Sequence, residues 1–543
     1  MDEDRLIQLW HEAVDSVESR FDLTCPQRTP ELSPELDSSQ KHAVWSIEVS
    51  ESKILYPESL SLSHPLLEGV LAREACRISL PSSLQSEKAR MDIACEYGRQ
   101  VGDDAIADQW LSLWKKASPI IKLPDGTKYR PHTFFEILWH LGKERAFNSM
   151  ISRLSRMNKH EIVIDFREWV EWFLRYVLEY ERPLSETEAS IVDTLLRNPE
   201  ADGEALAERA DVSLRWARSI RKKMKKRGQL MEFDVVVYSK IGIRAFQVIL
   251  LSDIDEQEDC SYLIEDCPFV FSSSSILTGG RGLYVTLCMP DNPENLMHLD
   301  NLVDTAKSQG LKAFIFERHR SGNWLNLNDY EPNTGDWSID WGSVRMEGQM
   351  LQREGLSFVY PELRLSDPTK SIELDETDIR LLSEFEKGKK TARSLQNTLG
   401  IRMDTILERL DRLREDDIIR KSWEVHHIGL IEESIVFTED ENARNCTTAL
   451  ALRLPRCFVD YDQDERLFMR SRLPEGGSFG LAHALEPINS LSGIHLVGDR
   501  IWGRWHLGDW IDEWNPRTGQ WRPTSKDLSR WYRSMGRGPD TAV

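Results

Sequence analysis

The sequence lacks the motifs of several large protein classes. No apolar run approaches the roughly 18 consecutive residues of a membrane span. The eight cysteines form no CxxC pair, and their spacing matches no zinc finger or ribbon. A GK[ST] phosphate loop is also missing. We therefore expect no membrane association, no cofactor, no metal and no enzyme activity.

Basic residues are in the minority. The chain has 69 Lys and Arg against 90 Asp and Glu, a formal net charge of -21, which argues against a protein covered in nucleic acid but leaves room for a local basic patch. The first residues are acidic and amphipathic, unlike a secretory signal. Eight cysteines in such a chain are typically reduced and buried, so we expect a cytoplasmic protein.

The chain is long enough for several domains. Its 543 residues are 40% hydrophobic and 29% charged, a composition typical of folded proteins, and a single core rarely grows beyond about 250 residues. Apolar residues recur at helical spacing in 65–79, 88–100, 133–157 and 165–180. This pattern predicts a helical domain of unassigned role over 1–182, with a proline-rich loop at 25–40.

One cluster in this domain could hold a metal ion. His132, Glu136 and His140 are spaced four residues apart, which places them along one face of a helix. Two histidines and a carboxylate can bind zinc, but the HExxH spacing is absent. We therefore favour ordinary helix side chains at these positions.

A three-helix pattern begins after residue 182. Ser185 and Glu188 form a capping-box pattern, and Asn198-Pro199 ends the first expected helix. A tight turn ending at Ser213 precedes a third helix that Gly228 ends, and a strand pattern follows. Three helices followed by a strand predict a winged helix-turn-helix over 183–235.

The same pattern recurs later in the chain. Leu374–Asp378 opens a second set, 190 residues after Leu184–Glu188, and Gly400–Arg402 forms its turn. Ile418-Ile419 then begins the expected wing. The repeat predicts a second winged helix-turn-helix over 373–424, after a linker at 346–372.

Each set is followed by a strand-rich segment. In the first copy, strands at 245–251, 268–276, 283–289 and 313–316 and helices at 257–266 and 294–309 give the order β-α-β-β-α-β. In the second copy we expect strands near 447–453, 456–460, 466–471 and 494–497 and a helix near 478–486. These patterns predict a ferredoxin-like domain over 236–345 and a degraded one over 425–543.

Each strand-rich segment ends in an aromatic motif. The first reads YEPNTGDW over 330–337, and the second reads WNPRTGQW over 514–521, in a tryptophan-rich tail. The expected fold is therefore an α+β multidomain protein: an N-terminal α-helical domain, then two copies of a winged helix-turn-helix plus a ferredoxin-like βαββαβ domain.

These residues resemble the leucine-responsive regulatory protein/AsnC family of transcription regulators. The family opens with a leucine, an acidic residue and Thr-Asp/Glu, as at Leu374–Asp378, and an acidic residue and two apolar wing residues follow its recognition helix, as at Asp417–Ile419. The resemblance covers 184–345 well and 374–500 loosely. It implies DNA binding, a ligand-sensing domain that pairs with another copy, and a small-molecule effector such as an amino acid.

The resemblance also suggests where an effector would bind. The family's glycine turn near the effector pocket corresponds to Thr278, Gly279, Gly280, Arg281 and Gly282. A glycine at 282 replaces the acidic residue often found there.

The first expected recognition helix is strongly basic. Between residues 209 and 227 there are nine basic residues and one acidic residue, whereas 402–421 holds six of each. We predict DNA contacts from Ser213, Arg215, Trp216, Arg218, Arg221, Lys222, Lys225 and Lys226, and in the second copy from Arg402, Arg409 and Arg412. Arg215, Trp216 and Arg218 would read bases, and the later basic residues would hold phosphates.

The pattern favours a sequence-specific, double-stranded-DNA-binding transcription regulator that responds to a ligand. Its two halves would pair as an intrachain pseudo-dimer. Further partners would be a second copy of the chain or the transcription machinery. A protein-interaction or small-molecule-sensing scaffold without DNA binding is the alternative, and an N-terminal metalloenzyme is a third interpretation.

Overall fold

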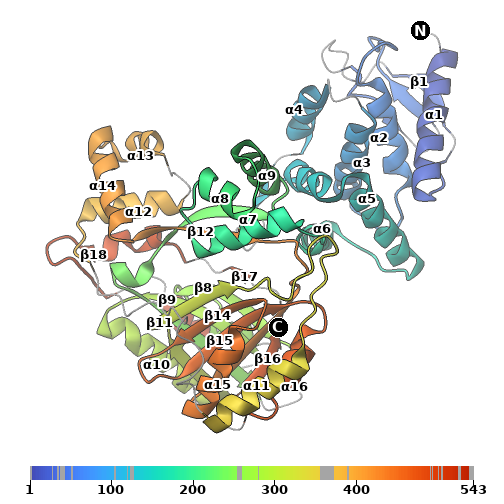
Figure 1. Cartoon of the computed structure of the whole chain (residues 1–543). Helices are drawn as coiled ribbons and strands as arrows, with labels where there is room; N and C mark the ends of the chain where they lie inside the picture. The colour runs from blue at the N-terminus through green and yellow to red at the C-terminus, as the bar shows by residue number, and fades with distance from the viewer. Residues whose placement is uncertain are drawn as a thin grey trace. The chain divides into compact units, whose positions relative to one another are not determined.

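The protein has a mixed α+β architecture of several domains (Figure 1). A computed structural model describes residues 3–536 except 27, 34–35, 37–42, 50–52, 103–105, 119, 123–127, 253–259, 279–280, 355–371, 388–390, 489–490, 492, 499–500, 503–504 and 524–527. The chain divides into two compact units, Met1–Arg182 with Lys226–Gly228, and Pro183–Lys225 with Gln229–Val543. No described helix is both long and apolar enough to span a membrane.

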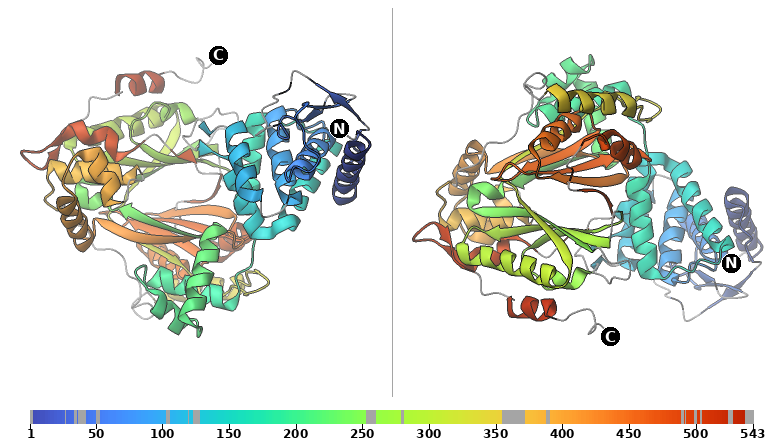
Figure 2. Two further views of the ribbon diagram at one scale, coloured as in Figure 1. Left: turned by 90° about the horizontal axis from the view of Figure 1, so that it is seen from above. Right: turned by 90° about the horizontal axis from the view of Figure 1, so that it is seen from below.

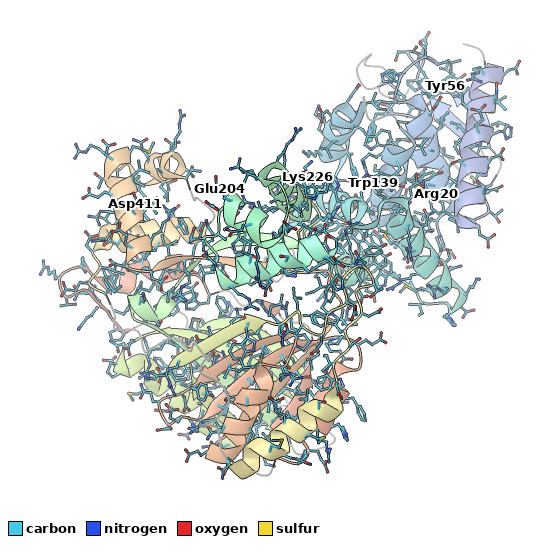
Figure 3. The ribbon with its side chains drawn as sticks, in the orientation of Figure 1. Arg20, Tyr56, Trp139, Glu204, Lys226 and Asp411 are labelled. Carbon is cyan, nitrogen blue, oxygen red and sulfur yellow. The ribbon has the colours of Figure 1, made fainter. Side chains whose placement is uncertain are left out.

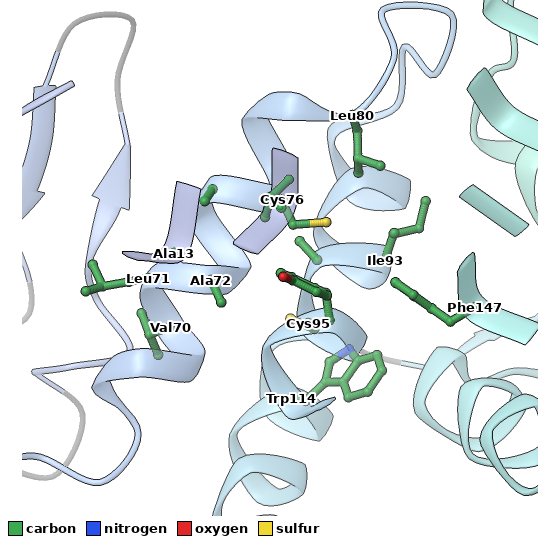
Figure 4. Close-up of a cluster of buried hydrophobic side chains, with 14 of the residues drawn as sticks. Ala13, Val70, Leu71, Ala72, Cys76, Leu80, Ile93, Cys95, Trp114 and Phe147 are labelled. Carbon is green, nitrogen blue, oxygen red and sulfur yellow. The ribbon is translucent and has the colours of Figure 1, made fainter. Parts of the chain in front are cut away.

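The first unit consists mainly of helices. They are α1 (Glu3–Phe21), α2 (Leu67–Ser79), α3 (Glu87–Val101), α4 (Ala107–Ala117), α5 (Pro131–Lys159) and α6 (Phe166–Glu179). This confirms the helical stripes expected from the sequence. Their apolar faces meet in one core that includes Cys76, Cys95 and Trp114 (Figure 4). Lys143, with a φ of 48°, interrupts α5.

The first unit also contains short strands. Its β1 (Thr29–Leu32) pairs in parallel with β3 (Lys53–Tyr56), which pairs with β2 (Glu48–Val49), and β4 (Ile121–Lys122) pairs with β5 (Lys128–Tyr129). The prediction of a loop throughout 25–40 was therefore wrong at β1. A four-residue edge strand that contains a proline gives little signal in the sequence.

The second unit contains two sets of three helices and a strand. The first is α7 (Glu186–Arg197), α8 (Gly203–Arg209), α9 (Leu214–Lys226) and β6 (Leu230–Val236); the second is α12 (Glu376–Glu386), α13 (Ala392–Leu399), α14 (Met403–Glu415) and β12 (Ile419–Val425). The sets begin 190 residues apart, and their third helices begin 189 residues apart (403 − 214). Capping boxes open both, at Ser185 and Asp375.

The two sets are joined through their strands. β6 pairs with β12 in antiparallel register along seven residues. Phe233 lies opposite Ser422, and these residues are 189 apart (422 − 233), the same offset that relates the third helices. The two copies of this strand therefore meet at equivalent positions, as in a twofold-symmetric contact between identical chains.

Two four-stranded segments form one continuous sheet. β7 (Ile243–Ser252), β8 (Val270–Ile276), β9 (Arg281–Pro290) and β10 (Leu311–Glu317) take the order β10-β7-β9-β8. β13 (Glu432–Thr438), β14 (Arg456–Tyr461), β15 (Leu467–Leu473) and β16 (Gly493–Val497) take the matching order β16-β13-β15-β14. β8 and β16 meet at Ile276 and Val497.

Helices accompany both segments. α10 (Pro293–Ser308) belongs to the first, and α15 (Glu441–Ala451) and α16 (Gly477–Leu485) belong to the second. The strand predicted near 447–453 was therefore wrong, because 441–451 is helical and β13 is the first strand. Asp440 caps α15 by accepting a hydrogen bond from the Ala443 backbone N–H at 2.9 Å. A short apolar run does not reveal its period, and the cap at Asp440 was the sequence signal that would have indicated a helix.

The helix predicted at 257–266 is only partly described. Its described part contains the short 3₁₀ helix η3 (Cys260–Leu263), and 253–259 lie outside the described residues. The linker predicted at 346–372 begins within α11 (Trp341–Glu354), and 355–371 are also outside the described residues.

The segment that follows each copy crosses to the other copy. β11 (Arg320–Leu325) pairs with β14, and β17 (Ile501–Trp502) pairs with β8. The aromatic motifs form equivalent hairpins, a bridge between Tyr330 and Trp337 and the strands β18 (Trp514–Asn515) and β19 (Gln520–Trp521). Trp337 Nε1 donates to the Ile428 carbonyl at 2.6 Å, and Trp521 Nε1 donates to the Ile241 carbonyl at 2.7 Å.

The helix that follows each aromatic hairpin also packs against the other copy. α11 packs against α15 and α16 of the second copy, and α17 (Leu528–Met535) packs against η3 of the first, where Trp531 Nε1 donates to the Leu263 carbonyl at 2.8 Å. The two halves of the sheet face one another with helices outside (Figure 2). Neither copy therefore completes its own core.

Candidate nucleic-acid interface

The α9 helix is fixed by a cap and by a narrow apolar stripe. The Ser213 hydroxyl accepts a hydrogen bond from the Trp216 backbone N–H at 3.3 Å, which satisfies one of the free donors of the first turn. Ala217, Ile220 and Met224 are buried one turn apart, against α7, α8 and the tail hairpin of the first copy. The opposite face of α9 therefore points outward.

That outward face is basic. Arg215, Arg218, Lys222, Lys223 and Lys226 are exposed. Trp216 is also exposed, at 50%, and the Lys223 ammonium lies 5.3 Å from its ring centroid. Within the described part of the chain, no carboxylate is ion-paired with Arg215, Arg218 or Lys222. Their spacing of three and four residues places these three cations in one stripe.

Other predicted contacts on α9 have inward partners. Lys225 forms an ion pair with Glu232 of β6, and its ammonium lies 4.9 Å from the Trp423 ring centroid on β12. Arg221 is half-buried, and its charge contributes to the lowered pKa of Glu232. Lys225 thus links α9 to the paired strands. The exposed positive charge without a paired carboxylate lies on the stripe defined by Arg215, Arg218 and Lys222.

The α14 helix has a different surface. Asp404, Glu408 and Asp411 are exposed on it, and Asp411 is labelled in Figure 3. Arg402 is exposed at its first turn, the only one of the three predicted contacts here that the described residues leave without an ion pair. This surface presents more negative than positive charge to a phosphate backbone.

The other two predicted contacts of α14 hold the helical set together. Arg409 Nη1 donates to Oδ1 of Asp375 and of Asp378 at 2.7 Å each, and Arg412 Nη2 lies 2.5 Å from Asp378 Oδ2. The Asp378 side chain is fully buried. Partial burial alone would raise the pKa of Asp375, but the hydrogen bond from Arg409 lowers this pKa.

The predicted effector turn joins the two halves of the sheet. His495 Nδ1 lies 2.7 Å from the Thr278 carbonyl, and the Leu496 backbone N–H donates to Thr278 Oγ1 at 2.7 Å. Gly279 and Gly280 lie outside the described residues, and Arg281 is exposed at the start of β9. A Cβ at Gly282 would lie 2.1 Å from the Leu250 carbonyl oxygen. Close approach of β9 to β7 therefore requires glycine at 282.

The three residues weighed as a metal site, His132, Glu136 and His140, lie on α5. His132 packs edge-on against Trp114, with ring centroids 6.3 Å apart, while His140 Nε2 lies 3.7 Å from Glu136 Oε1. Burial lowers the pKa of His132 and of His140. Among the residues that the structure describes, no three His, Cys, Asp or Glu side chains are grouped to hold a metal ion.

All eight cysteines are buried and without a disulfide bond. Burial raises the pKa of Cys267 and of Cys288 to about 12. These thiols are therefore protonated near neutral pH, which makes them poor nucleophiles and poor metal ligands.

Three arginines on β14 and β15 were not among the residues expected to have a functional role. Arg456 and Arg470 are buried, and Arg472 is half-buried beside them. Arginines at alternating positions of a predicted strand, Arg470 and Arg472, share one face. That spacing in an otherwise apolar strand was the available signal.

Comparison with known proteins gives structural matches only. No family model and no curated protein matches the sequence. The chain is similar to the siroheme decarboxylase NirDL, with a TM-score of 0.34, 14% identity, and coverage of 64% of this chain and 98% of that one. A second NirDL structure, in complex with an iron-uroporphyrin III analogue, gives a TM-score of 0.33 and the same identity and coverage. PH0061 gives a TM-score of 0.20 and 18% identity over 25% of this chain.

The expectation that the chain is not an enzyme is corrected by these matches. That expectation depended on the absence of familiar catalytic motifs. Two of the matching structures are of an enzyme, siroheme decarboxylase NirDL. Each of them covers 64% of this chain. The absence of those motifs therefore does not exclude catalysis.

Proposed function

We propose that the second unit binds double-stranded DNA, with α9 as the main recognition helix of an intrachain pseudo-dimer. In this proposal, α7–α9 with β6 and α12–α14 with β12 are two winged helix-turn-helix domains. The two sheet segments are ferredoxin-like domains that pair as two subunits of a dimer would, and the protein is a transcription regulator. The domain boundaries at 183–235, 236–345, 373–424 and 425–543 belong to the same proposal.

One observation supports the proposal most strongly. The stripe defined by Arg215, Arg218 and Lys222 is exposed, positively charged and without a paired carboxylate among the described residues. It lies on the third helix of a three-helix set, the helix that enters the major groove in helix-turn-helix proteins. Arginine at the first turn can make two parallel hydrogen bonds to a guanine edge.

The internal pairing supports the pseudo-dimer. The β6–β12 register and the crossed strands β11 and β17 relate the two copies by matching contacts. Dimeric helix-turn-helix proteins place two third helices on one duplex. In this chain the acidic surface of α14 would make its half of the contact the weaker one.

Charge reversal on α9 tests the proposal. Arg218→Glu with Lys222→Glu should weaken binding to a duplex pool at least about 100-fold in fluorescence anisotropy, because lost phosphate contacts and new repulsion act together. Lys115→Glu with Lys116→Glu on α4 changes net charge by the same amount at exposed lysines and serves as the control. Equal weakening in both variants, or none in either, would contradict the proposal and favour a protein-binding scaffold.

A further inference from the structure

One face of the second sheet segment carries unusual charge for a buried surface. Cα pairing places Arg470 beside Phe458 on β14 and Arg472 beside Arg456. Ile435 and Glu433 of β13 pair with Arg470 and Arg472, so all of these side chains share one face. The other face packs against α11, α15 and α16 through Val436, Val459 and Met469.

The charged face is the one turned toward the first copy. Ile435 belongs to a core cluster that also contains Ile276 and Tyr284 of the first sheet segment. Tyr284 stacks on Phe468, with ring centroids 5.2 Å apart. The arginines therefore lie on the same side of the sheet as this cluster, beside the contact between the two segments.

Two of these arginines are buried without an acceptor. Arg470 is 8% exposed, its Nε makes no hydrogen bond, and its closest carboxylate oxygen, on Glu433, is 3.7 Å away. Arg456 is also 8% exposed, and no described side chain or carbonyl accepts a hydrogen bond from it. Each guanidinium lies against the Phe458 ring, 4.2 Å from its centroid for Arg470 and 4.9 Å for Arg456.

The neighbouring Arg472, in contrast, has hydrogen-bond acceptors. It donates to Glu433 Oε2 at 3.2 Å and to Glu424 Oε1 at 3.4 Å, and it is more exposed than the other two. Burial, together with the charge of Arg472, lowers the pKa of Arg456 to about 10 although Glu424 opposes the change. A guanidinium carries five donors, and leaving a buried one such as Arg470 Nε unpaired is costly.

More unpaired polar atoms lie on the same side of the sheet. The hydroxyls of Ser272 and Ser274 on β8 and the Nε2 of His495 on β16 are buried without a partner in the described structure. Ser274 is two residues from Ile276 on the inner face, and His495 pairs in register with Ile435. Phe458 is half-buried and Asn323, opposite it on β11, is exposed, so the arginine pair borders solvent.

We propose that Arg456 and Arg470 form the anion-binding site of a small molecule that carries a carboxylate or phosphate group, with Phe458 contacting its apolar part. Two guanidinium groups on one ring suit an oxyanion that accepts hydrogen bonds from both. The site lies on the inner sheet face, apart from α9, so it does not depend on the proposed DNA binding. It also differs from the turn at 278–282.

The test measures anion binding by the full-length protein. Citrate and inorganic phosphate, each compared with sodium chloride at equal ionic strength, serve as probes in thermal unfolding and titration calorimetry. At about 100 times the dissociation constant, a probe should raise the Tm of the parent protein by roughly 2 to 4 °C. Stronger stabilisation by citrate would identify a carboxylate ligand, and stronger stabilisation by phosphate a phosphorylated one.

Substitutions assign the effect to the site. Arg470→Met and Arg456→Met should each weaken binding of the effective probe about 10- to 100-fold, as expected for a lost charge-assisted interaction. Without any probe, each should unfold at the parental temperature or higher, because a buried guanidinium without a hydrogen-bond acceptor has been removed. The control is Arg320→Gln on β11, which removes an arginine ion-paired with Glu465 in the turn between β14 and β15 and should keep parental binding.

Three results would overturn the inference. They are the absence of a probe-dependent rise in the parent, an equal rise in parent and Arg470→Met, and a large loss of stability in both Met variants without probe. The third would show that the arginines have structural acceptors. None of these outcomes bears on charge reversal at Arg218 and Lys222, so the two proposals fail separately.

Discussion

The third helices of the two copies share a scaffold and differ in how they use charge. In α9 the cations at Arg215, Arg218 and Lys222 are exposed and point away from the helical core. In α14 the equivalent positions at an offset of 189 are Asp404, Leu407 and Asp411 (404 − 215, 407 − 218, 411 − 222). The two helical sets therefore share their packing, and only α9 presents a basic surface.

The same comparison extends to the start of each helical set. Glu188 and Asp378 occupy the same position in their capping boxes, and both are buried. In the second copy Arg409 and Arg412 pair with Asp378, so these arginines are used inside the domain. Basic residues at similar places in the two sequence patterns are therefore exposed in the first set and ion-paired within the second set.

The largest expected effect concerns Asp378. Asp378→Ala should destabilise the protein by about 3 kcal/mol, because it leaves two arginines without their buried partner. Glu188→Ala should cost about 1 kcal/mol, the usual cost of a lost cap. Urea unfolding followed by tryptophan fluorescence compares them, and Trp510 and Trp514 lie in the same core as α12 and α14. Equal losses would remove this contrast between the copies.

A second difference lies on the paired strands. Burial alone would raise the pKa of Glu424, but the contact with His426, 3.6 Å between Nε2 and Oε2, and the charge of Arg472 lower it to about 2. The equivalent position in β6 is Val235 (424 − 189). Because the folded-state pKa is below the ordinary value, the stabilisation is present above about pH 4.5 and is lost as pH falls toward 2.

Glu424→Gln should therefore flatten the loss of stability over that window. The expected difference from the parent is on the order of 2 kcal/mol, fully developed above about pH 5. Acid unfolding followed by circular dichroism measures it, with Glu441→Gln, an exposed residue of α15, as the control. Parallel acid curves for parent and Glu424→Gln would contradict the assignment.

Adding positive charge to α14 tests the comparison between α9 and α14 by a gain of binding. Asp404→Lys with Asp411→Lys should raise affinity for duplex DNA about five-fold at low salt, because α14 then gains the charge that α9 already has. Anisotropy titration measures the gain. Glu68→Lys with Asp108→Lys adds the same charge to the first unit at exposed positions. If this control gains as much, net charge rather than α14 is responsible.

The smallest expected effect is a change in salt dependence. Lys222→Gln should reduce the slope of log affinity against log salt by about 1, the value for one lost phosphate contact. Lys225→Gln should change the slope less, because Lys225 is already paired with Glu232. Titrations between about 50 and 200 mM salt give both slopes. Equal slopes for the two variants would contradict the division of roles on α9.

The sequence predicted the helices and most strands because their signals are local. The capping-box pattern of Ser185 and Glu188 predicted the start of α7. The motifs at 330–337 and 514–521 predicted equivalent hairpins. The strand predicted near 447–453 was wrong because Thr447–Leu452 fits both the helical and the strand period. The residue that caps the helix, Asp440, lies outside this apolar run.

The candidate sites were predicted less well, because partners distant in sequence decide them. Nothing near Arg409 in the sequence shows that Asp375 and Asp378, in another helix, accept its hydrogen bonds. Similarly, Arg456 and Arg470 become unusual only when the strands around Phe458 bury them. Crossed contacts such as Trp337 to Ile428 also cannot be inferred from one sequence pattern.

The central claim, that α9 is the helix nearest to DNA, can be tested by site-directed cleavage. Ser219→Cys on α9 and Glu408→Cys on α14 occupy equivalent positions (408 − 219 = 189), and the eight native cysteines are buried, so an iron-EDTA reagent should attach selectively. With a duplex selected for binding, we predict strong cleavage from position 219 and weak cleavage from position 408. Cleavage confined to position 408, or none from either while the labelled protein still binds, would contradict the account.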